Sequence, residues 1–290
     1  MVCCICEKET PPRKRYCDRC RTLVGVRDQM KRRAALRMAY DRSADGFRCH
    51  WCGVLLEEED IADPFHLCFD HLIPEKTSEL VVSSEILNHM KSDFAPEEFL
   101  RAIRELAAHR AGRPFDRDLL EFRYWSRRLP SPPEPGEPPH RGALKLVRVE
   151  ECVICGGEPV PWSYYCPRCR GLVLIHNTTH RHRVRAMKEA WSEEEDGFLC
   201  RHTGVRVDDD KPRSPWYISF DHGVPGDDDT LVVTAWWVNV MKSALSGEEF
   251  WLVVGEFDRY LREGGEFDRD VVGFSYCCLL YTSPSPRDRS

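Results

Sequence analysis

Alternating hydrophobic and polar positions predict a short strand in two distant parts of the chain, over His66–His71 and over Tyr217–His222. A period of two residues is typical of a strand that buries one face. Pro74 and Pro225 end these strands, because proline lacks the N–H group that sheet pairing requires. A turn and an apolar Leu-Val-Val run follow in both places, so the two regions share one order of elements.

Two helices are predicted after each strand. The first covers Ser84–Ser92 in one region and Ala235–Ser243 in the other, and the second covers Pro96–Arg110 and Glu248–Arg262. The sequence Ser-Gly-Glu-Glu at 246–249 has the capping-box arrangement, in which the serine and the last glutamate each accept a backbone N–H bond from the other residue. Strands and helices together predict an α+β fold.

The whole pattern is one domain duplicated in tandem. Four cysteines recur 149 positions later, a Phe-Asp-His motif recurs 151 positions later, and a Phe-Asp-Arg-Asp motif recurs 152 positions later. Offsets that change so little exclude coincidence. We therefore predict repeat 1 at residues 1–129, a proline-rich linker at 130–147 and repeat 2 at 148–277. Residues 278–290 resemble a translated sequencing adapter and are left out of the fold prediction.

Composition and charge narrow the class of protein. No run of about 18 apolar residues is present, so we expect no contact with a membrane. The first residues lack the basic-then-apolar order of a secretion signal. We therefore expect the protein to be located in the cytoplasm, or in the host cytoplasm if the chain is viral. The net charge of −6 does not indicate nucleic-acid binding, yet residues 13–48 carry a balance of +8 and residues 162–191 one of +5. These segments are expected to contact phosphates or to form solvated helix faces.

The fifteen cysteines include one set of four at the start of each repeat, with the spacing Cys-x2-Cys-x10-Cys-x2-Cys. Two such knuckles direct four thiolates to one point, which is the arrangement that structural zinc requires. We predict one structural Zn²⁺ in each repeat, with disulfides or a redox pair as alternatives. The predicted ligands are Cys3, Cys6, Cys17 and Cys20 in repeat 1, and Cys152, Cys155, Cys166 and Cys169 in repeat 2.

A second polar set lies where the predicted strand is followed by the first helix. It consists of an Asp-His pair with an Asn and a Lys 17 and 20 positions after the His. The residues are Asp70, His71, Asn88 and Lys91 in repeat 1, and Asp221, His222, Asn239 and Lys242 in repeat 2. Together with an opening Cys-x2-(Cys/Thr)-Gly motif, this set resembles the HNH endonuclease family of phage type. The resemblance covers Arg48–Asp93 and Leu199–Ala244.

The resemblance implies a ββα-metal core with flanking helices in each repeat, and an endonuclease that hydrolyses the phosphodiester bonds of DNA, with RNA as an alternative substrate. It assigns His71 and His222 as general bases, and Lys91 and Lys242 as phosphate contacts. Asp70, Asn88, Asp221 and Asn239 are the implied ligands of Mg²⁺ or Mn²⁺, with one ion in each core.

The family pattern also has a middle Asn that orients the His, and this chain has Glu79 and Thr230 at that position. One alternative is therefore a non-catalytic, zinc-dependent nucleic-acid-binding protein with vestigial HNH cores. In that case the Asp-His pair is a packed strand end. A zinc-stabilised protein-interaction module is a further alternative. Both repeats keep the four polar residues, so the sequence does not identify either repeat as the inactive one. The sequence leaves the oligomeric state open. The Phe-Asp-Arg-Asp motif, at 115–118 and 267–270, has no assigned chemistry.

Overall fold

The computed structural model describes residues 1–26, 28–74, 76, 78–125, 149–161, 163–173 and 180–271. The predicted linker at 130–147 and the adapter-like residues at 278–290 lie outside this part of the chain. The described residues belong to two compact units, and each unit contains segments of both repeats. Unit 1 consists of Met1–Ala107, Leu120–Tyr124 and the described residues from Met241 onward, and unit 2 consists of Ala108–Leu119 and the described residues of Trp125–Val240.

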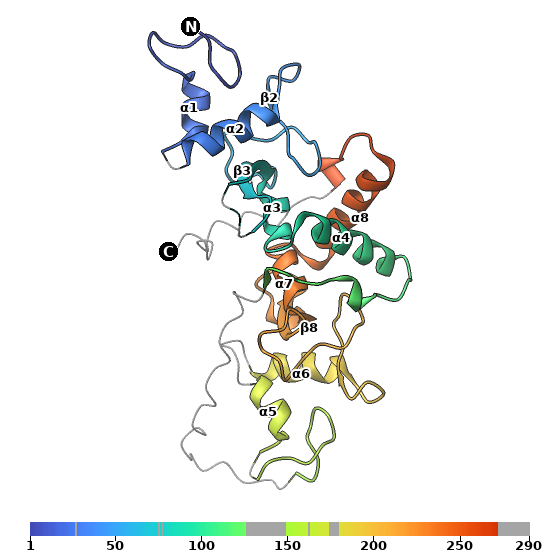
Figure 1. Ribbon diagram of the computed structural model, residues 1–290. Helices are drawn as coiled ribbons and strands as arrows, with labels where there is room; N and C mark the ends of the chain where they lie inside the picture. The colour runs from blue at the N-terminus through green and yellow to red at the C-terminus, as the bar shows by residue number, and fades with distance from the viewer. Residues whose placement is uncertain are drawn as a thin grey trace. The chain divides into compact units, whose positions relative to one another are not determined.

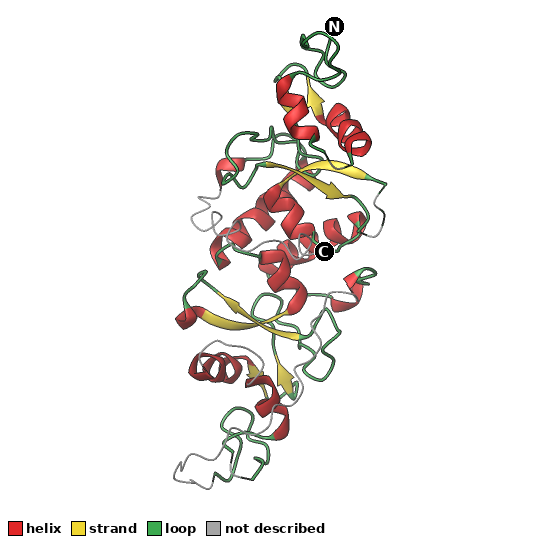
Figure 2. Cartoon of the chain, turned by 90° about the vertical axis from the view of Figure 1, so that its left-hand side faces the viewer, coloured by secondary structure: helices red, strands yellow, loops and turns green. Residues whose placement is uncertain are grey.

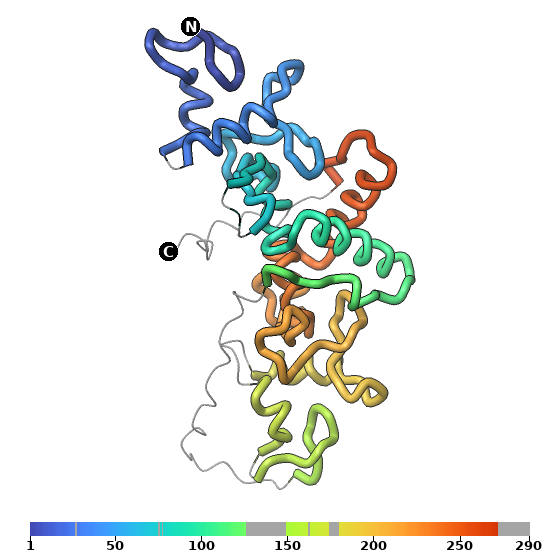
Figure 3. Tube along the Cα trace, viewed as in Figure 1, coloured from blue at the N-terminus to red at the C-terminus, as the bar shows by residue number. Residues whose placement is uncertain are grey.

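The described elements of the two repeats follow one another in the same order, and repeat 2 has one additional short helix, η3 (Figures 1 and 3). In repeat 1 these are α1 (Asp18–Val24), α2 (Gln29–Ala39), β1 (Tyr40–Asp41), β2 (Gly46–Phe47), β3 (Leu67–His71), β4 (Leu80–Ser84), α3 (Glu85–Lys91), α4 (Pro96–Arg110) and η1 (Arg117–Leu119). In repeat 2 these are α5 (Pro167–Val173), α6 (His180–Ala190), β5 (Trp191–Ser192), β6 (Gly197–Phe198), β7 (Ile218–His222), η3 (Asp228–Thr230), β8 (Leu231–Ala235), α7 (Trp236–Lys242), α8 (Gly247–Glu263) and η4 (Arg269–Val271).

An antiparallel hairpin followed directly by a short helix forms the centre of each repeat (Figure 2). In repeat 1 the hairpin pairs Phe69 with Val82, and in repeat 2 it pairs Phe220 with Val233, so the register is identical. Ser84 ends β4 and caps α3, because its side chain accepts a hydrogen bond from the N–H of Leu87 at 3.4 Å. The α+β prediction is confirmed at this level.

The helix that follows each cysteine set packs against one face of the hairpin. In repeat 1 the guanidinium of Arg32, on α2, lies 4.8 Å from the ring centre of Phe69. In repeat 2 Arg183, on α6, lies 5.7 Å from the ring centre of Phe220. Both guanidiniums therefore contact an aromatic ring of the hairpin, so part of each basic segment has a structural role.

The predicted helices agree with the structure to within one residue at each end. The capping box at the start of α8 is present, with Ser246 accepting from the N–H of Glu249 and Glu249 accepting from the N–H of Ser246. Within unit 1, α8 packs beside α4, and the rings of Phe99 and Phe257 lie 5.7 Å apart. Both rings are fully buried, which stabilises this helix pair by about 1.5–3 kcal/mol for each side chain.

Candidate metal centres and the Asp-His constellation

The four cysteines at the start of each repeat come together as predicted. Within each set the sulfur atoms all lie within 4.8 Å of one another. The Sγ atoms of Cys6 and Cys17 are 3.5 Å apart, as are those of Cys155 and Cys166. Four sulfurs placed tetrahedrally about 2.3 Å from a zinc ion are about 3.8 Å apart, so both clusters have the dimensions of a structural zinc site.

Local backbone geometry forms these cysteine clusters. The first knuckle of each repeat turns through a residue with positive φ, Glu7 at 60° in repeat 1 and Gly156 at 74° in repeat 2. Glycine adopts this conformation without strain, so the first knuckle of repeat 2 turns more easily than that of repeat 1. Burial opposes ionisation of Cys3, yet hydrogen bonds from the backbone N–H groups of the knuckle lower its pKa to about 6. Burial raises the pKa of Cys20, so binding of a metal must release its proton.

The structure brings Asp70 and Lys91 of repeat 1 together in a buried ion pair. The Asp70 side chain is 0% exposed and that of Lys91 is 1% exposed, with Nζ 3.1 Å from Oδ1. The same ammonium donates to the carbonyl of His71 at 2.8 Å, and the indole N–H of Trp51 donates to Asp70 Oδ2 at 3.3 Å. A metal ion at Asp70 would have to displace Lys91, so this carboxylate does not fit a divalent ion as it stands.

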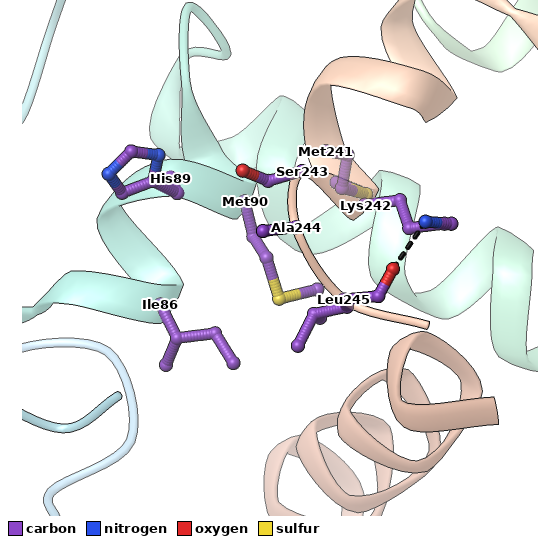
Figure 4. A pocket seen from close by; sticks show the side chains of 8 residues that line it. All are labelled: Ile86, His89, Met90, Met241, Lys242, Ser243, Ala244 and Leu245. Atoms are coloured by element: carbon purple, nitrogen blue, oxygen red, sulfur yellow. Dashed lines mark hydrogen bonds between the residues drawn. The ribbon is translucent and has the colours of Figure 1, made fainter. Parts of the chain in front are cut away.

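In repeat 2 a histidine takes the place of the tryptophan beside the corresponding carboxylate. Asp221 is buried, and His202 Nε2 lies 3.3 Å from its Oδ2, at the position that Trp51 occupies in repeat 1. The Lys242 ammonium donates to the carbonyl of Leu245. Figure 4 shows this bond beside a small cavity in unit 1, which has room for about one water molecule, or about 10 Å³. This cavity is too small for a nucleotide.

Both predicted asparagines contact the strand from the helix that follows it. The Asn239 amide nitrogen donates to Ser219 Oγ at 2.8 Å and to the carbonyl of Phe220 at 3.2 Å. In repeat 1 Asn88 lies beside Cys68, which is equivalent to Ser219. Both contacts of Asn239 use its nitrogen, so they leave the amide oxygen of Asn239 as the atom able to bind a cation.

His222 has a carboxylate partner that the sequence interpretation missed. Its side chain is 31% exposed, and Nε2 lies 2.9 Å from Oδ1 of Asp228 in η3. His182, on α6, extends the network, with Nδ1 3.7 Å from Asp228 and Nε2 3.2 Å from Asp229. Repeat 1 has Thr77 and Ser78 at the positions of these two acids. The sequence feature that could have indicated this partner is the run of three aspartates at 227–229, which repeat 2 has and repeat 1 lacks.

Exposed cations gather on the zinc-binding part of repeat 1. Arg13, Lys14 and Arg15 are exposed on the loop between the two knuckles, and Arg37 is exposed on α2. Among the described residues no salt bridge involves these four, whereas Arg19 pairs with Glu58. Repeat 2 has Trp, Ser and Tyr at the positions of residues 13–15. The loop between the two knuckles is therefore basic in repeat 1 only.

Comparison with known proteins adds no relative. The chain matches no family model, no curated protein and no solved structure. Within the described residues, no helix has both the length and the apolar character needed to cross a membrane. The HNH interpretation stays a prediction, based on the polar motif and on the hairpin and helix that carry it.

Proposed function

We propose that this protein is a metal-dependent, HNH-type endonuclease that hydrolyses phosphodiester bonds of DNA. The observation that carries the proposal is the repeated placement of Asp-His at the end of a hairpin strand, with Asn and Lys on the helix directly after the hairpin. Two hairpins of identical register keep the same four residue types at the same spacing. Packing alone does not require this combination of polar residues.

Repeat 2 is the core that supports catalysis better. A general base must be accessible and held in one orientation, and His222 is 31% exposed and bonded to the Asp228 carboxylate at 2.9 Å. A carboxylate on Nε2 favours the tautomer with its proton there, which leaves Nδ1 to accept a proton from water. Asp228 thus takes the orienting role that the family pattern gives to a middle Asn. His71 has Thr77 at the corresponding position.

Asp221 and Asn239 are the residues that would hold the divalent ion in repeat 2. Both offer hard oxygen atoms, and the two hydrogen bonds made by the Asn239 nitrogen fix its side chain against β7. A bound Mg²⁺ or Mn²⁺ would polarise the phosphate and stabilise the leaving oxygen.

The zinc-binding part of repeat 1 would hold the DNA backbone. Arg13, Lys14 and Arg15 present exposed positive charge on the loop between the two knuckles of the cysteine cluster, and Arg37 adds an exposed charge on α2. Each phosphate neutralised by such a residue releases a condensed counterion, so binding should weaken with salt. In this proposal repeat 1 contributes affinity and repeat 2 contributes chemistry.

A specific observation favours a second candidate function, a zinc-dependent nucleic-acid-binding protein without activity. Asp70 is completely buried and Asp221 is only 4% exposed, whereas a catalytic metal ligand needs a path to the substrate. Under this alternative both Asp-His pairs are packed strand ends. The cysteine clusters and the exposed cations would keep their roles, so DNA binding alone does not separate the two functions.

Nicking of supercoiled plasmid tests the proposal. Zinc-loaded protein is assayed with Mg²⁺ or Mn²⁺, and in buffer freed of both ions rather than with a chelator that would also remove zinc. We expect divalent-dependent nicking by the wild type and none by the His71→Ala/His222→Ala double variant. Activity that survives in the double variant contradicts the catalytic assignment. Salt-sensitive DNA binding without cleavage in any of these ions supports the second function.

A further inference from the structure

The Phe-Asp-Arg-Asp motif near the end of each repeat packs on the core of the other repeat. Residues 115–118 come from repeat 1, but they lie in unit 2 with the hairpin of repeat 2. Residues 267–270 come from repeat 2 and lie in unit 1 with the hairpin of repeat 1. The described part of each unit is therefore completed by a segment of the other repeat.

In unit 2 the motif binds through an aromatic ring and a guanidinium. The ring of Phe115 lies 5.9 Å from that of Trp216 and 6.0 Å from that of Trp237, and Phe115 is buried. Arg117 makes two bonds of 2.9 Å to the Asp208 carboxylate, and its guanidinium lies 4.8 Å from the ring centre of Trp216. Both bonds come from Nη2, while Nη1 donates to the carbonyl of Arg206 at 3.1 Å. A planar guanidinium can bond two such acceptors and stack on a ring at the same time, whereas a lysine ammonium is only a point charge.

Unit 1 repeats this arrangement with its own residues. The ring of Phe267 lies 5.9 Å from that of Phe65, which is equivalent in sequence to Trp216. Arg269 bonds the Asp63 carboxylate at 2.6 Å, and its guanidinium lies 5.1 Å from the ring centre of Phe65. Each core thus receives one Phe and one Arg on one aromatic ring and one carboxylate.

We propose that the motif is an exchange latch, which holds the two repeats together independently of the covalent linker. The occupant of each receiving site is the motif of the other repeat in the same chain. Each site recognises the motif through two contacts. The phenylalanine ring of the motif packs against an aromatic ring of the core, and the arginine of the motif bonds a carboxylate that is at least half buried. Because both sites are filled reciprocally, the segments behave as in an exchanged dimer whose two protomers have been fused.

Cleavage of the linker in the full chain tests the latch. A protease site is inserted within residues 130–147, the folded protein is cut, and the halves are followed by sedimentation over a dilution series. We expect them to stay associated as one particle. Separation of the wild-type halves at micromolar concentration would overturn the proposal. The assay requires no nuclease activity, so its outcome is independent of the proposed function.

Substitutions in the latch give the quantitative test. Removing both guanidiniums with Arg117→Ala/Arg269→Ala should raise the Kd of the cut halves about 10²- to 10³-fold, as for two interface arginines. The matched control, Arg123→Ala/Arg262→Ala, removes two exposed arginines that pair within their own repeat, and should leave the Kd unchanged. If the alanine variant loses its circular dichroism, Arg117→Lys/Arg269→Lys replaces it, with about a tenfold rise expected. An unchanged Kd in a folded latch variant contradicts the latch, and so does an equal rise in the control.

Discussion

Lys91→Met should destabilise repeat 1 far more than loss of a surface charge. The Asp70 and Lys91 side chains are 0% and 1% exposed, and their charged atoms lie 3.1 Å apart. The substitution removes the ammonium that neutralises a carboxylate inside the protein, and breaking a buried pair in this way costs about 3–5 kcal/mol. An exposed pair such as Lys31 with Asp28 is worth about 0–1 kcal/mol, so Lys31→Met is the matched control.

Hydrogen–deuterium exchange of peptides from β3 and α3 measures this cost locally, which suits a chain with two units because a single unfolding transition need not describe it. A loss of 3–5 kcal/mol should speed exchange by about two to three and a half orders of magnitude. The double variant Asp70→Asn/Lys91→Met removes both charges of the pair and should regain most of the protection. Wild-type protection in Lys91→Met refutes the buried-pair reasoning, as does a double variant that exchanges as fast as the single one.

Three further predictions concern the metal sites, the base and the basic loop. The purified protein should contain two zinc ions per chain by mass spectrometry of its metals, and Cys20→Ser or Cys169→Ser should each leave one; an unchanged content would exclude these ligands. Asp228→Asn should slow DNA cleavage at least about tenfold while DNA affinity stays constant, and equal rates would remove its positioning role. Alanine at residues 13–15 should reduce the slope of log affinity against log salt by about 0.9 for each lost phosphate contact, and an unchanged slope would place the DNA elsewhere.

Much of the secondary structure and both cysteine clusters could be predicted because their causes are local. The alternation before His71 and His222 reflects one buried strand face, and the Ser246–Glu249 capping box lies within four consecutive residues. The cysteine spacing is equally short-range, since each knuckle is a single turn. The tandem duplication strengthened the strand and cysteine predictions, because both of these patterns were seen twice.

The partners of the polar residues could not be predicted, because they depend on tertiary packing. Nothing near Asp70 in the sequence indicates that Lys91 and Trp51 would close around its carboxylate. The bond from His222 to Asp228 depends on the path of the turn after β7, and the turn was expected only as a connection. The exchange of the Phe-Asp-Arg-Asp segments joins residues 91 positions apart, as in Arg117 with Asp208, and no local pattern encodes such a pairing.

Cleavage by the two single variants His71→Ala and His222→Ala tests the central proposal most directly. Both proteins should bind DNA and retain their zinc, so single-turnover nicking in Mg²⁺ compares only the two candidate bases. We expect His222→Ala to lose about 10²- to 10⁴-fold in rate and His71→Ala to stay close to the wild type, because the Asp228 carboxylate contacts His222 and repeat 1 has Thr77 at the position of Asp228. Equal rates for the two variants, or a larger loss in His71→Ala, would contradict the assignment of catalysis to repeat 2.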